Sequence, residues 1–202
     1  EQKTIFPIAH SLLVGVECFV TVLPQIRPRV YDLCRVHPRP ILAYSDAEWT
    51  PAQHPPLAPG RGLGGCIFHN KEYLACSVVT PMEVVNSLAM RNTQIIPLEL
   101  MAAAGLILTF GERLRGQDVI FFNHNQTACA CLRKGASRSL DIQHLTTAWH
   151  ILCHHMGCRI WIEWVPSAAN PADILSRHHR SEEDVLDVFD ESRTQYQQMS
   201  MP

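Results

Sequence analysis

The chain has 202 residues, enough for one medium-sized domain with a flanking segment. Hydrophobic residues make up 47% and charged residues 18%, a composition that builds a core and excludes a largely disordered chain. The formal net charge of -2 gives no sign of nucleic acid, but the charge is unevenly distributed. Between residues 111 and 180 there are eight Lys or Arg and five Asp or Glu, whereas Glu182–Glu191 holds six acids and no base. A near-neutral sum can therefore conceal a phosphate-binding face.

The first predicted segment, residues 1–37, contains an apolar stretch from Ile5 to Ile26. Its apolar residues between Leu12 and Leu23 recur at helical spacing, and Glu17 and two prolines interrupt it, so an amphipathic helix fits better than a membrane span. Prolines alternating with arginines between residues 24 and 40 predict a linker. The chain begins at Glu1 without a basic region before the apolar stretch, so we expect a piece of a longer polypeptide with no signal peptide.

Eight cysteines in a chain with its own apolar core indicate reduced thiols rather than a disulfide scaffold. We therefore expect an intracellular protein, in the cytoplasm or the nucleus. Cys153, His154, His155 and Cys158 could form a zinc site, but no CxxC pair is present, and buried thiols with helix-surface histidines are the favoured interpretation.

The remaining chain alternates between strand and helix patterns. In chain order, the predicted elements are strands at Ile41–Ser45, Gly64–Phe68 and Leu74–Val79, a helix at Leu98–Leu114, a strand at Val119–Phe122, helices at Asn125–Leu132 and Asp141–Met156, a strand at Arg159–Val165 and a helix at Pro171–Arg177. A hairpin turn is expected at residues 69–72 because Asn70 tolerates the left-handed conformation, and Asp141 and Asn170 are candidate N-caps. The order βββαβα(α)βα predicts an α/β fold, a mixed β-sheet flanked by helices.

Three acids stand at the ends of these predicted elements. Asp46 follows the first strand, Glu99 lies in the first turn of the first long helix, and Asp173 opens the last helix. Taken singly, an acid at a helix start is equally well explained by the helix dipole. Taken together, carboxylates at one end of a sheet are the ligands that hard divalent ions prefer, and two such ions about 4 Å apart can catalyse phosphodiester hydrolysis.

At these residues the chain resembles the ribonuclease H domain of retroelement reverse transcriptases. The matching motifs are Ser45-Asp46-Ala47, Leu98-Glu99-Leu100, Phe121-Phe122-Asn123-His124-Asn125, Trp164-Val165-Pro166 and Asn170-Pro171-Ala172-Asp173-Ile174-Leu175-Ser176-Arg177. The last motif is the most specific, and the order of the motifs is stronger evidence than any one of them.

The resemblance implies a ribonuclease H-like domain at residues 38–180 that cuts the RNA strand of an RNA–DNA hybrid with two Mg²⁺ or Mn²⁺ ions. Asp46 would bridge the ions, and Glu99 and Asp173 would each hold one. Residues 1–37 would be a polymerase thumb or connection remnant or a linker, residues 181–202 an acidic C-terminal tail, and the partner a polymerase domain of the same longer polypeptide, with no membrane association. On the two-ion scheme, Asp46→Asn should leave the metal-free fold no less stable, because it relieves repulsion between acids.

One position departs from the family pattern, since the aspartate of the third motif falls on His124. Asp118 is a poor substitute because it sits at the opposite end of the same strand. His124 thus takes a catalytic position without a negative charge, which favours Mn²⁺ over Mg²⁺ and predicts that cutting falls below about pH 6.5, where histidine protonates.

This departure leaves the enzymatic activity open between three alternatives. The first is a nuclease for hybrids, and the second is a decayed fold that binds nucleic acid or scaffolds a polymerase without cutting. The third is a proofreading-type exonuclease, suggested by Asp46-Ala47-Glu48 and ranked last.

Four further residues are candidates for nucleic-acid binding, namely Asn125, Arg133, Lys134 and Arg138. The three cations follow the third motif and could contact phosphates. A solvated helix end and loop explains them equally well.

Overall fold

We describe the chain from a computed structural model, which covers residues 20–21, 24, 39–50, 60–177 and 194–201. The chain divides into two compact units, Glu1–Val36 and His37–Pro202. In the first unit residues 20 and 21 are helical, and the rest of the amphipathic helix expected at Leu12–Leu23 lies outside the described residues, as do most of the linker and the acidic run Glu182–Glu191. Within the described parts of the chain, no helix has the length and apolar character that a membrane span requires.

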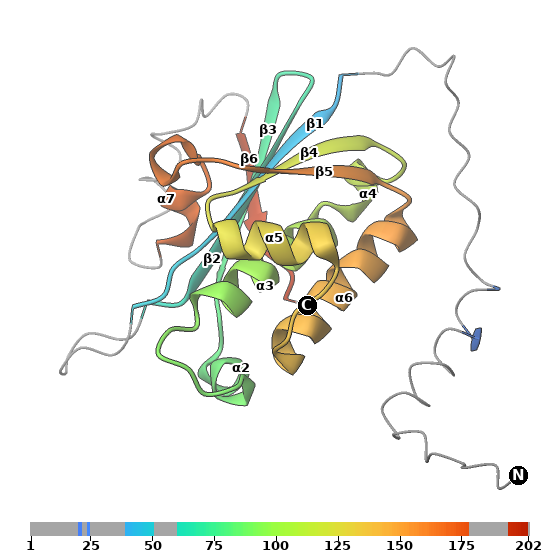
Figure 1. Ribbon diagram of the computed structural model, residues 1–202. Helices are drawn as coiled ribbons and strands as arrows, with labels where there is room; N and C mark the ends of the chain where they lie inside the picture. Colours follow the sequence, from blue (N-terminus) through green and yellow to red (C-terminus); the bar gives the residue numbers. More distant parts are fainter. Residues whose placement is uncertain (1–19, 22–23, 25–38, 51–59, 178–193, 202) are drawn as a thin grey trace, which may run out of the picture. The chain divides into compact units, whose positions relative to one another are not determined.

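A six-stranded mixed sheet organises the second unit. Its strands are β1 Ile41–Ala47, β2 Gly62–His69, β3 Glu72–Val79, β4 Asp118–Asn123, β5 Arg159–Trp164 and β6 Thr194–Gln198. They lie in the order β5-β4-β1-β2-β3-β6 (Figure 1). β1, β2 and β3 pair antiparallel, whereas β4 runs parallel to β1 and β5 parallel to β4. The predicted α/β class and mixed sheet are confirmed.

The hairpin between β2 and β3 turns where the sequence places it. Asn70 and Lys71 have positive φ angles of 51° and 70°, the left-handed conformation that a two-residue hairpin turn requires. The pairing of His69 with Glu72 closes the hairpin. β2 buries its apolar residues on both faces, which is typical of a strand inside a sheet.

The sixth strand corrects the predicted extent of the C-terminal tail. Residues 194–198, expected beyond the domain, pair parallel with β3 at the edge of the sheet. Met199 continues into the core with only 2% of its surface exposed, and the Ser200 amide donates to Thr109 Oγ1 at 2.7 Å. The end of the chain is therefore part of the sheet rather than a detached tail.

Helices cover the sheet, and the main differences from the prediction lie at their ends. They are α2 Met82–Ser87, α3 Ile95–Thr109, α4 Gly111–Leu114, α5 Gln126–Lys134, α6 Leu140–Met156 and α7 Asp173–Ser176, with a 3₁₀ turn at Ser167–Ala169. The single helix expected at Leu98–Leu114 is divided at Phe110, a buried residue with non-helical angles. Asp141 is not the N-cap of α6, because Ser139 holds that position and the Asp141 carboxylate instead binds Arg91 and the Ala89 amide.

The helices form layers on both sides of the sheet. Gly64 and Gly65 are successive strand residues and therefore face opposite sides. A Cβ on Gly65 would meet the Leu106 side chain of α3, whereas one on Gly64 would lie 2.5 Å from the backbone of Leu175 and Ser176. α3 thus packs on one face with α5 and α6 grouped beside it (Figure 1), and α7 packs directly on the other face.

Candidate metal centre

The sheet topology brings three predicted site residues together. β1 and β4 are parallel neighbours in which Ser45 pairs with Asn123, so the following residues, Asp46 and His124, emerge at the same edge. Glu99 comes up from α3, where it is fully buried. One ligand atom from each of Asp46, Glu99 and His124 lies within 4.8 Å of the others.

The histidine lies between the two carboxylates. His124 Nδ1 is 2.6 Å from Asp46 Oδ1 and 3.3 Å from Glu99 Oε1. Both acids are buried, whereas the imidazole is about one-quarter exposed. Among the described residues, neither His124 Nδ1 nor Glu99 Oε1 has a hydrogen-bond partner of good geometry. His124 Nδ1 therefore lies within hydrogen-bonding distance of Asp46, with the Glu99 carboxylate close to the same nitrogen.

Burial and charge shift the titration of this group. Burial raises the pKa of Glu99 above its ordinary value, and the neighbouring Asp46 carboxylate raises it further. Hydrogen bonding to the Asp46 carboxylate raises the pKa of His124 to about 9, with burial opposing the shift and the charge of Glu99 adding to it. Without a metal, the imidazolium therefore acts as the cation of the site at neutral pH.

The donor set fits a divalent metal ion. Glu99 Oε1 and, once the ring is neutral, His124 Nδ1 are buried donor atoms without a well-oriented partner among the described residues, and Asp46 supplies a second carboxylate beside them. Two carboxylate oxygens and one imidazole nitrogen suit Mn²⁺ better than Mg²⁺, which prefers oxygen alone. Because a metal takes the neutral imidazole, its binding must displace the proton from His124.

Asn123, which the sequence pattern did not mark as a site residue, aligns this group. Asn123 is fully buried, and its Nδ2 donates to Glu99 Oε2 at 2.7 Å and to Ser45 Oγ at 3.1 Å. Its Oδ1 accepts from the Asn125 amide at 2.8 Å, which fixes the chain just after His124. The available signal was its position, a polar residue at the end of an apolar strand and directly before His124.

The last motif holds Asp46 from the other side. Asn170 Nδ2 donates to Asp46 Oδ1 at 3.1 Å, and Ser176 Oγ donates to Asp46 Oδ2 at 2.6 Å. Asn170 Oδ1 also accepts from the Ala172 amide, so the predicted cap stabilises the turn before α7 rather than the first residue of that helix. Both oxygens of Asp46 are therefore fixed by side chains about 125 residues later in the chain.

Asp173, the third predicted acid, is not one of the three residues whose ligand atoms lie together, although its charge helps to raise the pKa of His124. Its Oδ1 accepts from Arg177 Nη2 at 2.8 Å and from Ser167 Oγ at 3.2 Å. Arg177 Nη1 also lies 3.9 Å from Glu48 Oε1. The carboxylate expected to hold a second ion is thus paired with a cation of the chain itself.

The predicted nucleic-acid-binding residues take different roles. Asn125 is the N-cap of α5, accepting from the Thr127 and Ala128 amides. Arg133 lies against β5, donating to the Ile162 carbonyl at 3.0 Å, with Glu163 Oε2 3.5 Å away. Lys134 and Arg138 are exposed.

Asp118 and the predicted zinc-site cysteines, Cys153 and Cys158, do not belong to the group of Asp46, Glu99 and His124. Asp118 pairs with Arg159 at the opposite end of β4, as its position in the strand predicts. Cys153 and Cys158 are buried, and the Cys158 thiol donates to the Cys153 carbonyl. The metal-binding group found in this part of the chain does not include them.

No protein-family model matches the chain, and no curated protein matches it in sequence. Among solved structures, it is similar to a ribonuclease H1 from the halophilic archaeon Halobacterium salinarum, with a TM-score of 0.48, 16% identity and coverage of 73% of this chain and 97% of that one. It is also similar to the N-terminal RNase H domain of a Mycobacterium tuberculosis protein, with a TM-score of 0.46, 16% identity and coverage of 75% and 98%. A ribonuclease H1 isolated from compost, solved in complex with an RNA/DNA hybrid, has a TM-score of 0.45, 15% identity and coverage of 67% and 92%.

Proposed function

We propose that this chain carries a ribonuclease H-like nuclease domain that hydrolyses the RNA strand of an RNA–DNA hybrid. The observation that supports this most directly is the buried group of Asp46, Glu99 and His124, in which two acids and an imidazole face one another at the edge of the sheet. The order of the motifs along the chain agrees with it.

Some residues of the site would hold a metal ion, and others orient those ligands. A divalent ion bound there supplies the Lewis acidity that lowers the pKa of water and stabilises charge on the phosphate. Asp46, fixed by Asn170 and Ser176, presents one oxygen toward His124, and Asn123 turns Glu99 toward the same point. His124 must lose its proton before it can donate a lone pair, so metal affinity rises as the pH approaches about 9. This replaces the limit of about pH 6.5 expected for an unperturbed histidine.

A second candidate is a binding module of the same fold that does not cut. It is favoured by the pairing of Asp173 with Arg177 and by the protonated His124, which together supply cations where a nuclease would use metal ions. Such a site tolerates a phosphate backbone but activates no water.

The proposal extends to the longer polypeptide that would contain this domain. The motifs resemble those of retroelement reverse transcriptases, so we infer that residues 1–37 join this domain to a polymerase of the same polypeptide. An intracellular location follows from that role.

Three labelled substrates test the proposal, namely an RNA–DNA hybrid, a DNA duplex and single-stranded RNA, each with Mg²⁺ or Mn²⁺. We expect cutting of the RNA strand of the hybrid, stronger with Mn²⁺, and its loss in Glu99→Gln, which keeps the side-chain volume. Binding of the hybrid without cutting under all conditions would favour the second candidate. If the hybrid is neither bound nor cut, both candidate functions are rejected.

A further inference from the structure

Buried polar atoms without a hydrogen-bond partner gather at two places in the described part of the chain. Six such side-chain atoms occur there, and two of them belong to the candidate metal centre. Three of the others are Trp49 Nε1, Arg61 Nε and Thr80 Oγ1. Thr80 is completely buried, whereas Trp49 and Arg61 are partly exposed. An unsatisfied buried donor destabilises a fold, so three of them together point to an acceptor that they share.

The register of the sheet places these three residues in one row. The antiparallel bridge between Thr50 and Gly60 extends the pairing of β1 with β2, so Trp49 and Arg61 lie opposite each other just inside it. Thr80 lies opposite Arg61 on the other side, since its amide donates to the Arg61 carbonyl at 3.0 Å. Directly opposite residues project to the same face with Cβ atoms about 5 Å apart. Trp49 packs against the core that α3 covers, which identifies the face.

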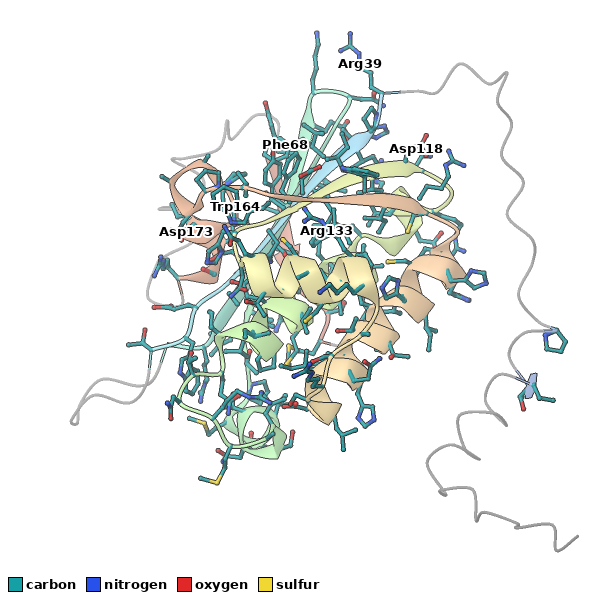
Figure 2. All side chains as sticks on the ribbon, viewed as in Figure 1. Arg39, Phe68, Asp118, Arg133, Trp164 and Asp173 are labelled. Carbon is teal, nitrogen blue, oxygen red and sulfur yellow. The ribbon has the colours of Figure 1, made fainter. Side chains whose placement is uncertain are left out.

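Arg61 has no anionic partner among the described residues. The neighbouring acid along the chain, Glu48, serves the other face of the sheet, where its Oε1 accepts from Thr50 Oγ1 at 3.4 Å and lies 3.9 Å from Arg177 Nη1. A fully exposed arginine needs no partner other than water, and Arg39, which projects away from the sheet in Figure 2, is of this kind. Arg61 differs because its Nε is not exposed to solvent.

The donors of this row suit a phosphate oxyanion. The N–H groups of an indole and a guanidinium can only donate, and the Thr80 hydroxyl can donate as well. Guanidinium groups bind phosphate through paired N–H bonds, which a single buried hydroxyl and an indole can supplement. A metal cation needs several oxygen ligands, and this row supplies one. Because Trp49 and Arg61 are partly exposed, a ligand can reach the row from solvent.

We propose that Trp49, Arg61 and Thr80 form a binding site for a phosphate group, separate from the candidate metal centre. Asp46 lies three residues before Trp49, about 10 Å along the strand and on the opposite face. The phosphate belongs either to a nucleic-acid backbone or to a small phosphate compound, since the same donors recognise both. The site does not depend on the proposed function, because no residue of the metal centre takes part in it.

Titration of the full chain with inorganic phosphate tests the site, in EDTA and at constant ionic strength. NMR spectra follow the indole N–H signals of the four tryptophans, assigned with Trp→Phe variants. We expect the Trp49 signal to move. The Trp161 and Trp164 signals should stay in place, because both donors are already engaged within the chain. A Trp49 signal that stays in place would overturn the proposal, and so would movement of the Trp164 signal alone.

Removal of each donor in turn measures its part in binding. Arg61→Gln should weaken phosphate binding by at least about tenfold, and Thr80→Val and Trp49→Phe by about two- to tenfold, the ranges for charged and neutral hydrogen bonds. Arg39→Gln is the matched control, with the same change of charge at an exposed position before β1, and should bind phosphate like the wild type. Equal weakening in Arg39→Gln and Arg61→Gln would reveal a general charge effect and overturn the site.

Thermal unfolding separates binding from a structural role. Without phosphate, Thr80→Val should be at least as stable as the wild type, because it removes a hydroxyl without a partner. Phosphate should raise the thermal midpoint of the wild type more than that of Thr80→Val. In the control Thr146→Val, which removes an equally buried hydroxyl bonded to the Ile142 carbonyl, the rise should match the wild type. A marked loss of midpoint in phosphate-free Thr80→Val would contradict the proposal.

An RNA–DNA hybrid distinguishes the two sources of the phosphate. Its binding to the wild type, Arg61→Gln and Arg39→Gln is compared in EDTA, so that the hybrid stays intact. Weaker binding in Arg61→Gln alone, with competition by inorganic phosphate, would assign the site to a nucleic-acid backbone. Equal hybrid binding in all three, with phosphate binding lost in Arg61→Gln, would assign it to a small phosphate compound. If no hybrid binds at all, the proposed function fails, and the NMR titration still decides on the phosphate site.

Discussion

Arg177 Nη2 lies 2.8 Å from Asp173 Oδ1, so the last acid of the motif series is paired with the last residue of its own motif. Burial opposes the charge on Arg177, but its pairing with Asp173 outweighs this and raises the pKa of the guanidinium. The guanidinium is permanently charged, so a second metal ion at Asp173 must compete with it.

Arg177→Gln is therefore expected to strengthen Mn²⁺ binding about two- to fivefold, the range for releasing a partly exposed ion pair. Isothermal titration calorimetry with Mn²⁺ measures both the affinity and the number of ions bound. Arg115→Gln is the control, because Arg115 pairs with Glu112 on the surface at a similar distance of 2.8 Å. The same affinity in Arg177→Gln and the wild type would show that Arg177 does not limit metal binding.

His124→Asp should convert the site to one that prefers Mg²⁺. The change replaces the cation between Asp46 and Glu99 with a third carboxylate, so repulsion should lower the thermal midpoint in EDTA, and Mg²⁺ should restore it. Cutting of an RNA–DNA hybrid with Mg²⁺ should rise severalfold or appear from nothing. His144→Asp, at an exposed position of α6, is the control. If the wild type already cuts as fast as His124→Asp with Mg²⁺, His124 does not limit cutting with Mg²⁺ and the prediction is wrong.

The metal-free protein should lose stability as the pH rises from about 6.5 to about 9. His124 has a folded-state pKa of about 9, above its unfolded value near 6.5, so its stabilisation is fully present below about pH 6.5 and lost as the pH rises through about 9. Glu99 acts in the same direction, because burial raises its folded pKa and its ionisation is therefore unfavourable in the fold. We expect a loss of about 1–2 kcal/mol after allowing for solvent screening at the partly exposed ring.

Urea unfolding in EDTA at several pH values measures this loss. In His124→Asn the slope between pH 6.5 and 9 should become shallower, because only the part that comes from Glu99 remains. A wild-type stability that stays level or rises over this range would contradict the assigned charge on His124.

Asp46→Asn should destabilise the metal-free protein by about 1–3 kcal/mol, the opposite of what the sequence alone suggested. Both carboxylate oxygens of Asp46 accept hydrogen bonds, from Asn170 and Ser176, and an amide places a donor against one of these donors. The change also leaves the His124 cation without its nearest anion. Asp173→Asn, at a partly exposed carboxylate, should cost less than 1 kcal/mol. Chemical denaturation in EDTA compares the two, and equal stabilities of Asp46→Asn and the wild type would contradict this account.

The parts of the fold that the sequence predicted are those set by local pattern. Apolar runs and turn residues located the strands β1 to β5, and Asn70 marked the hairpin. β6 was missed because its residues, Thr194 to Gln198, are mostly polar and show no apolar alternation, so only pairing with β3 defines the strand. The division of the first long helix at Phe110 was missed for a similar reason, since Phe110 is apolar and buried like the helix residues around it.

The site shows the same division between local and distant information. Motif order located Asp46, Glu99 and His124, and strand topology brings them together. The pairing of Asp173 with Arg177 and the high pKa of His124 depend on atoms that come close only in the folded chain. No periodicity or spacing carries that information.

The dependence of Asp46 on α7 has a consequence for synthesis of the chain. α7 has four residues, too few to be stable as an isolated helix, so its position depends on packing against the sheet where Gly64 leaves room. Ser176 reaches Asp46 across 130 residues of sequence. On the ribosome, β1 is therefore made long before Ser176, whose hydroxyl donates a hydrogen bond to the Asp46 carboxylate. A nascent chain that lacks its last motif therefore has β1 but not the hydrogen bonds that hold the Asp46 carboxylate in place.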